Sequence, residues 1–130
     1  MKNELSSIEK RKVKCTGGKL EVTNDTSMAM VGIDDKDIFK TLLNQAVRAM
    51  PSHYEQDESC NYVMAMLLDI SPRDGMEAML ITQMMAVQSQ AMEYMKRASL
   101  PEQPTEGIDV NINRATKLQR TFVQQLEALQ

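Results

Sequence analysis

The chain has 130 residues, a formal net charge of −3 and a hydrophobic fraction of 42%, values that fit one globular domain. Aromatic residues make up 4% of it, and it contains 12 methionines and no tryptophan. This composition favours helices around a soft, methionine-rich core, because strands prefer β-branched and aromatic residues. No run of about eighteen apolar residues occurs, which excludes a membrane-spanning helix. We therefore expect an all-α protein that does not enter a membrane.

Residues 1–27 form a basic arm, whereas the remainder of the chain is acidic. Apolar and charged residues alternate on both sides of Thr16–Gly17–Gly18, a pattern typical of a short β-hairpin. An isolated hairpin is marginally stable in water, so the arm is either flexible or a short β-hairpin that lies on another surface. Residues 28–130 are expected to form a single helical domain.

The first two helices are predicted from apolar periodicity and from their flanking residues. One follows Asp34 and ends near Met50, because Pro51 interrupts it. Its acidic residues (Asp34, Asp35 and Asp37) fit a helix N-terminus better than a calcium loop, which needs a longer alternating pattern. The second runs from about Glu58 to Asp69 and is apolar almost all round, which is typical of a buried helix.

A third, long helix is expected over residues 72–99. Ser71 is placed as its cap, Pro72 as its first residue and Asp74 in its first turn, because each residue type is favoured at that position. Its main apolar stripe is flanked by Met79, Ile81, Met85 and Met92. The apolar sector is therefore wider than a simple coiled-coil seam.

The fourth helix is expected from Asp109 to the chain end, after a helix-breaking loop over Leu100–Gly107. Its apolar face comprises Ile112, Ala115, Leu118, Phe122, Leu126 and Leu129. A short loop between two helices favours antiparallel packing. The predicted fold is thus a small bundle of about four helices with a long antiparallel C-terminal helical hairpin.

Two segments, SPRDGMEAMLITQMMAVQSQAMEYMKRA and NRATKLQRTFVQQLEAL, resemble a family of uncharacterised bacterial proteins, many of them proteobacterial. The resemblance covers about residues 58–129. It rests on Pro72–Arg73–Asp74, Glu77–Leu80, Gln83–Met84 and Ala91–Glu93 in the first segment, and on Leu118, Arg120–Phe122 and Leu126–Leu129 in the second. It implies a helical fold and transfers no activity, cofactor or site residue.

Residues suited to catalysis or metal binding are scarce. The two cysteines, Cys15 and Cys60, and the single His53 are too few and too widely spaced for a disulfide framework or a zinc site. Cys60 stands at a predicted helix start, where a thiolate is favoured, but Asp57 and Glu58 oppose that charge. We therefore predict a cytoplasmic protein without catalysis, cofactor or metal.

The leading functional hypothesis is a helical interaction or adaptor protein that self-associates and docks a protein partner. Methionine-rich surfaces repack against varied partners. The predicted docking residues are Met79, Ile81, Met85 and Met92, together with the outer row of the fourth helix. The alternative is that the first two helices cover this methionine flank within one chain.

A second hypothesis is a DNA-binding accessory subunit of a phage or mobile element, similar to the small DNA-recognition subunit of a packaging motor. The candidate contacts to phosphate are Lys10, Arg11, Lys12, Lys14, Arg114, Lys117 and Arg120. The sequence contains no clear helix-turn-helix and its pI is about 5.2. The sequence leaves nucleic-acid binding open.

Overall fold

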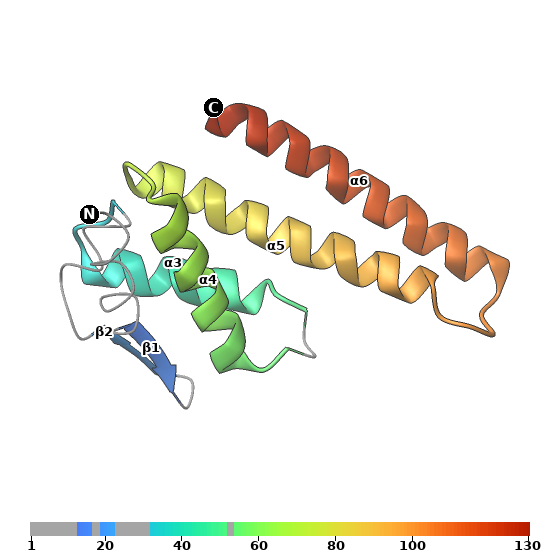
Figure 1. Ribbon diagram of the computed structural model, residues 1–130, viewed down its shortest axis with the longest axis horizontal. Helices are drawn as coiled ribbons and strands as arrows, with labels where there is room; N and C mark the ends of the chain where they lie inside the picture. The colour runs from blue at the N-terminus through green and yellow to red at the C-terminus, as the bar shows by residue number, and fades with distance from the viewer. Residues whose placement is uncertain (1–12, 17–18, 23–31, 52–53) are drawn as a thin grey trace. The chain divides into compact units, whose positions relative to one another are not determined.

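The computed structural model describes residues 13–16, 19–22, 32–51 and 54–130 of the chain. Its elements are β1 (Val13–Thr16), β2 (Lys19–Val22), α3 (Lys36–Arg48), α4 (Gln56–Ile70), α5 (Gly75–Ala98) and α6 (Thr105–Leu129) (Figure 1). The predicted helical fold is confirmed, although several helix ends differ from those expected. The predicted boundary between arm and domain, at residues 27 and 28, lies outside the described residues.

The two strands form the hairpin that was one of the two alternatives for the arm. They pair in antiparallel register, with Val13 opposite Val22 and Thr16 opposite Lys19. β1 lies against α4, so a helix supplies the surface that an isolated hairpin lacks. Gly17 and Gly18, the predicted turn, lie outside the described residues.

Helices α3 and α4 pack together and contribute most of the core in the N-terminal part of the chain. The buried residues of α3 are Phe39, Leu42, Leu43 and Ala46, and those of α4 are Ser59, Cys60, Val63, Met64, Leu67 and Leu68. Their spacing of three and four places them on one side of each helix. The prediction that α4 is buried all round was too broad, because Tyr62 and Ile70 are exposed.

Helix α3 is capped by Asp35 and not by Asp34. The Asp35 carboxylate accepts hydrogen bonds from the backbone N–H groups of Asp37 (2.8 Å) and Ile38 (3.1 Å). These are two of the N–H groups that a helix start leaves without a partner inside the helix. An acidic residue therefore caps this helix, as predicted. The cap is Asp35, one residue after the expected Asp34.

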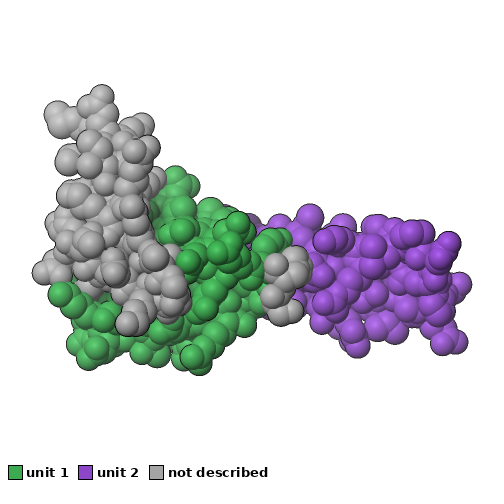
Figure 2. Space-filling view, turned by 90° about the horizontal axis from the view of Figure 1, so that it is seen from below, with its two compact units in different colours: residues 1–82 green, residues 83–130 purple. Residues whose placement is uncertain are grey.

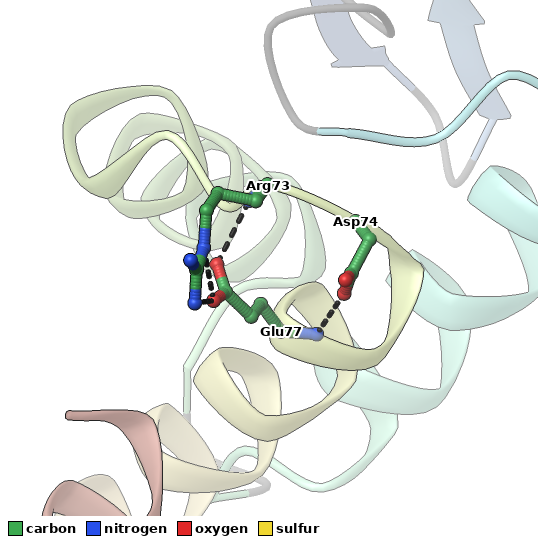
Figure 3. A network of polar contacts seen from close by, with 3 residues as sticks. All are labelled: Arg73, Asp74 and Glu77. Atoms are coloured by element: carbon green, nitrogen blue, oxygen red, sulfur yellow. Dashed lines mark hydrogen bonds and ion pairs between the residues drawn. The ribbon is translucent and has the colours of Figure 1, made fainter.

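The junction between α4 and α5 corrects the predicted start of the long helix. Ser71 ends α4 in the left-handed conformation (φ 54°), and its N–H donates to the carbonyl of Leu67 at 2.9 Å. The cap of α5 is Asp74, whose carboxylate accepts from the N–H of Glu77 at 2.9 Å (Figure 3). Pro72 therefore lies in the turn, because a residue closing one helix in this conformation does not also start the next.

Glu77 completes this helix start by reaching back to Arg73 (Figure 3). One carboxylate oxygen accepts from the Arg73 backbone N–H (2.8 Å), and the other accepts from its Nε (2.7 Å). These hydrogen bonds lower the pKa of the Glu77 carboxyl and raise the pKa of Arg73. The arrangement resembles a capping box, with the glutamate binding one residue before the cap.

The chain divides into two compact units, residues 1–82 and 83–130 (Figure 2). The division falls within α5, between Thr82 and Gln83. The second unit thus consists of the remainder of α5 and the whole of α6. In the described part of the chain, none of the helices combines the length and apolar character needed to cross a membrane.

Candidate interaction surfaces

Helices α5 and α6 form the antiparallel hairpin that the sequence predicts, with residues 99–104 between them (Figure 1). A polar contact and a cation–π contact lie between the helices. Gln119 Nε2 lies 3.3 Å from the sulfur of Met95, and the guanidinium of Arg114 lies 5.5 Å from the ring centre of Tyr94. The loop is shorter than predicted, because α6 begins at Thr105 and not near Asp109.

The hairpin loop is tied to the end of α5 by Gln103. Its side-chain Nε2, which has two N–H groups, lies within hydrogen-bond distance of three carbonyl oxygens, those of Arg97 (2.7 Å), Leu100 (2.8 Å) and Ala98 (3.2 Å). Carbonyls in the last helical turn lack partners within the helix, so this amide stabilises the turn. Sequence reasoning missed Gln103, because a glutamine between two prolines carries no specific capping pattern.

Helix α6 carries a seam of residues separated alternately by four and three positions, all of them apolar except Gln119. The seam comprises Ile108, Ile112, Ala115, Gln119, Phe122, Leu126 and Leu129, the spacing of a coiled-coil heptad. Ala115 is the one buried residue of α6, all of which the structure describes. Ile112 remains 48% exposed and Leu126 39% exposed. Packing within the chain therefore leaves much of this seam uncovered.

A second stripe with the same spacing runs along α5 through Ile81, Met85, Gln88, Met92 and Met95. Its first two residues are buried, whereas Met92 is 53% exposed and Met95 is also exposed. A stripe that begins in the core thus continues onto the surface in the second half of α5.

The contact between Gln119 and Met95 brings the exposed parts of the two stripes to the same side of the hairpin. Ile112, Gln119 and Val123 share one side of α6 because they are separated by seven and four residues. Met92 lies one turn before Met95. We call the exposed apolar residues on this side, Met92, Met95, Ile112, Val123 and Leu126, the apolar flank.

A row of cations begins at another edge of the hairpin. The guanidinium groups of Arg97 and Arg114 each lie 5.5 Å from the ring centre of Tyr94. Tyr94 and Met95 are about 100° apart around α5, and Arg114 and Gln119 are about 140° apart around α6. The two contacts between the helices therefore lie at different edges of the hairpin. We call the exposed cations Arg97, Arg114, Lys117 and Arg120 the basic flank. Each step of three residues turns about 60° around α6, so the row runs from the edge at Tyr94 across the helix and reaches the apolar flank at Arg120, which neighbours Val123.

The structure separates the four predicted docking residues of α5 into two pairs. Ile81 and Met85 are 1% and 4% exposed, which corrects their assignment to a docking surface, because both belong to the core. Met79 and Met92 are exposed. The wide apolar sector of the helix is thus shared between core and surface, a division that periodicity does not distinguish.

The predicted nucleic-acid contacts are also divided. Arg114, Lys117 and Arg120 are exposed along α6. Lys10, Arg11 and Lys12 lie outside the described residues, and for Lys14 the structure describes the backbone of β1 alone. Sequence reasoning missed Tyr94, because its contact with Arg114 joins residues that are distant in sequence.

No cluster of metal-ligating side chains occurs in the part of the chain that the structure describes, and the side chain of Cys15 lies outside that part. No three His, Cys, Asp or Glu side chains converge there, and Cys60 is 2% exposed. His53 lies outside the described residues. The exposed features of the hairpin are its apolar flank and its basic flank.

Comparison of this chain with models of protein families, with curated proteins and with solved structures found no match. The resemblance to an uncharacterised bacterial family therefore stays a prediction.

Proposed function

We propose that the protein is a non-catalytic helical interaction protein that self-associates through the apolar flank. The observation that carries this proposal is the uncovered heptad seam of α6, in which Ala115 is buried while Ile112 and Leu126 remain substantially exposed. Seams with this spacing pack against other helices in water. Contiguous exposed apolar residues of this kind are typical of interaction sites.

A second copy of the chain is the partner that fits this surface best. Two hairpins placed face to face form a four-helix arrangement in which each seam contacts more than one neighbouring helix. Such a contact is isologous, since both copies contribute the same flank around a two-fold axis. Residues 78–92 contain no charged side chain, so this stretch of α5 introduces no like-charge repulsion between copies.

The size of the hairpin is compatible with a stable contact. Helix α6 has 25 residues and is therefore about 37 Å long. A face of this length that is about 20 Å wide covers roughly 700 Å², close to the ~800 Å² per partner of a standard interface. The methionines at this face can adjust to their neighbours because their side chains are unbranched.

Size-exclusion chromatography with light scattering tests the proposal on the whole chain at about 50 µM, a concentration that populates micromolar complexes. We expect a dimer or a higher closed oligomer. The double variant Met92→Glu/Val123→Glu places a charge on each helix at exposed positions and is expected to elute as a monomer. A matched control, Ile38→Glu/Met76→Glu, alters two exposed apolar residues of the other unit and is expected to elute like the unsubstituted chain.

A monomeric unsubstituted chain at this concentration would contradict the proposal. Equal dissociation of both double variants would also contradict it, because the effect would then follow from added charge and not from the apolar flank. Circular dichroism of each variant verifies that its helices are retained.

We also infer a cytoplasmic setting, because two cysteines are too few for the disulfide framework of a small secreted domain.

A further inference from the structure

We infer that the basic flank of the hairpin binds the phosphodiester backbone of nucleic acid. This inference goes beyond self-association and rests on different residues. The basic flank comprises Arg97, Arg114, Lys117 and Arg120, and its two arginines at Tyr94 lie at a different edge of the hairpin from the Gln119–Met95 contact. Arg114 and Lys117 therefore lie away from the apolar flank, whereas Arg120 borders it at Val123.

The spacing of the cations on α6 suits a row of phosphates. Arg114, Lys117 and Arg120 recur every three residues and are all exposed. Each step advances about 4.5 Å along the helix and turns about 60° around it, so the cations form an oblique row whose rise is comparable with the about 3.4 Å per phosphate along one DNA strand. Residues 110–126 contain no Asp or Glu, so the cations of this stretch are not neutralised by neighbours in sequence. The helix thus presents a local positive row on an acidic chain.

The ring of Tyr94 holds two arginines in place at the end of this row. Arg97 and Arg114 lie at the same distance from the ring centre, and Nε of Arg97 also donates to Glu93 at 3.2 Å. A guanidinium held by an aromatic ring loses less side-chain entropy when it binds. Its planar N–H groups match two phosphate oxygens at once. Tyr94 therefore acts as a positioning residue for Arg114.

Weak binding is expected, because the whole chain has a net charge of −3 that opposes its association with phosphate. The row contributes three cations on α6, so binding should be weak and should fall steeply with salt, because each neutralised phosphate releases a counterion. A duplex and a single strand share the phosphodiester chemistry that this row recognises. We see no set of aromatic residues suited to base stacking among the described helices of the hairpin, which favours backbone contacts.

The test measures fluorescence anisotropy of a labelled 20-base-pair duplex of DNA with the whole chain in about 50 mM NaCl, where phosphate contacts are strong. Binding is expected, with an affinity that decreases between low and physiological salt. The triple variant Arg114→Gln/Lys117→Gln/Arg120→Gln should bind at least about tenfold more weakly, and its salt slope should fall by roughly 2–3. The control Lys36→Gln/Lys40→Gln/Arg48→Gln removes three cations from α3 and should bind like the unsubstituted chain.

The variant Tyr94→Leu tests whether the aromatic ring positions Arg114 for binding, because the substitution leaves the charge of the chain unchanged. This variant retains every cation, so the salt slope should be unchanged while the affinity falls several-fold. A single strand of DNA or RNA of equal length tests whether the duplex form matters, and binding of either form supports backbone recognition.

Three results would overturn the inference. The first is absence of binding to any nucleic acid at low salt. The second is an equal loss of binding in the two triple variants, or a loss confined to Lys10→Gln/Arg11→Gln/Lys12→Gln, which would assign the binding to overall charge or to the arm. The third is equally tight binding of poly-glutamate, which would assign the flank to acidic protein surfaces. Light scattering of the α6 triple variant shows whether it still self-associates, so failure of this inference is distinguishable from failure of the proposed function.

Discussion

Single residues at the α4–α5 junction show how local chemistry sets a helix boundary. Both Ser71 and Asp74 are good capping residues, and the sequence pattern alone favoured Ser71, because Pro72 follows it. In the structure, Ser71 closes α4 and Asp74 opens α5. Ser71 ends α4 because its backbone is left-handed. The preference of serine for helix caps does not predict this backbone conformation.

The ion pair at this junction leads to a prediction about pH. Hydrogen bonds from Arg73 lower the pKa of the Glu77 carboxyl below its ordinary value of 4.5. Because the folded-state pKa is lowered, the stabilisation is present above the ordinary pKa and is lost as pH falls through the folded-state value. In the variant Arg73→Gln, we expect the Glu77 carboxyl to titrate at a higher pH, closer to 4.5.

An NMR titration of the Glu77 side-chain carboxyl measures this change. The control is Lys96→Gln, which removes a cation from the last turn of the same helix and should leave the titration of Glu77 unchanged. An unaltered Glu77 midpoint in Arg73→Gln would show that the pair does not persist in solution. Arg73 is exposed and Glu77 is half-buried at the surface, so the effect concerns the helix start more than global stability.

At the scale of elements, the entry to α3 is held close to the turn between α4 and α5. Gly32 has a φ of +73°, and a Cβ atom at this position would lie 2.7 Å from the backbone oxygen of Pro72 and 2.7 Å from the nitrogen of Asp74. Only a residue without a side chain permits this approach. Neither segment is regular structure, so this contact was not predictable from periodicity.

We therefore expect Gly32→Ala to lower the free energy of unfolding by about 2–4 kcal/mol, combining the cost of positive φ with overpacking against backbone. Urea denaturation followed by circular dichroism measures the change. Gly75→Ala is the matched control, because a Cβ there meets nothing within 4 Å, and it should stabilise by no more than about 1 kcal/mol. Equal midpoints for the two variants would contradict the close approach at Gly32.

At the scale of the whole molecule, self-association couples stability to chain concentration. Binding to a second copy favours the folded state, so the melting temperature of the unsubstituted chain should rise by a few degrees for each tenfold increase in concentration. Met92→Glu/Val123→Glu should melt at the same temperature at all concentrations. Thermal scans monitored by circular dichroism at several chain concentrations provide the measurement, and a melting temperature independent of concentration in the unsubstituted chain would argue against an assembly.

The sequence by itself determined the helical class and the order of the four helices, because a period of 3.6 and a scarcity of β-branched and aromatic residues are local properties. It also predicted the antiparallel hairpin, since the prolines around Gln103 leave a short connection. The sequence did not locate the start of α6. Gly107 favours a loop that continues to residue 107, whereas the helix begins at Thr105, directly after Pro104.

Only the tertiary structure decided which apolar residues are covered. Ile81 and Met92 lie on the same stripe of α5, yet the first is buried and the second exposed, since burial depends on which segments pack against each turn. The pairing of Tyr94 with Arg114 likewise depends on the register of the hairpin. Periodicity specifies the face of a helix, whereas contacts between distant segments specify what that face touches.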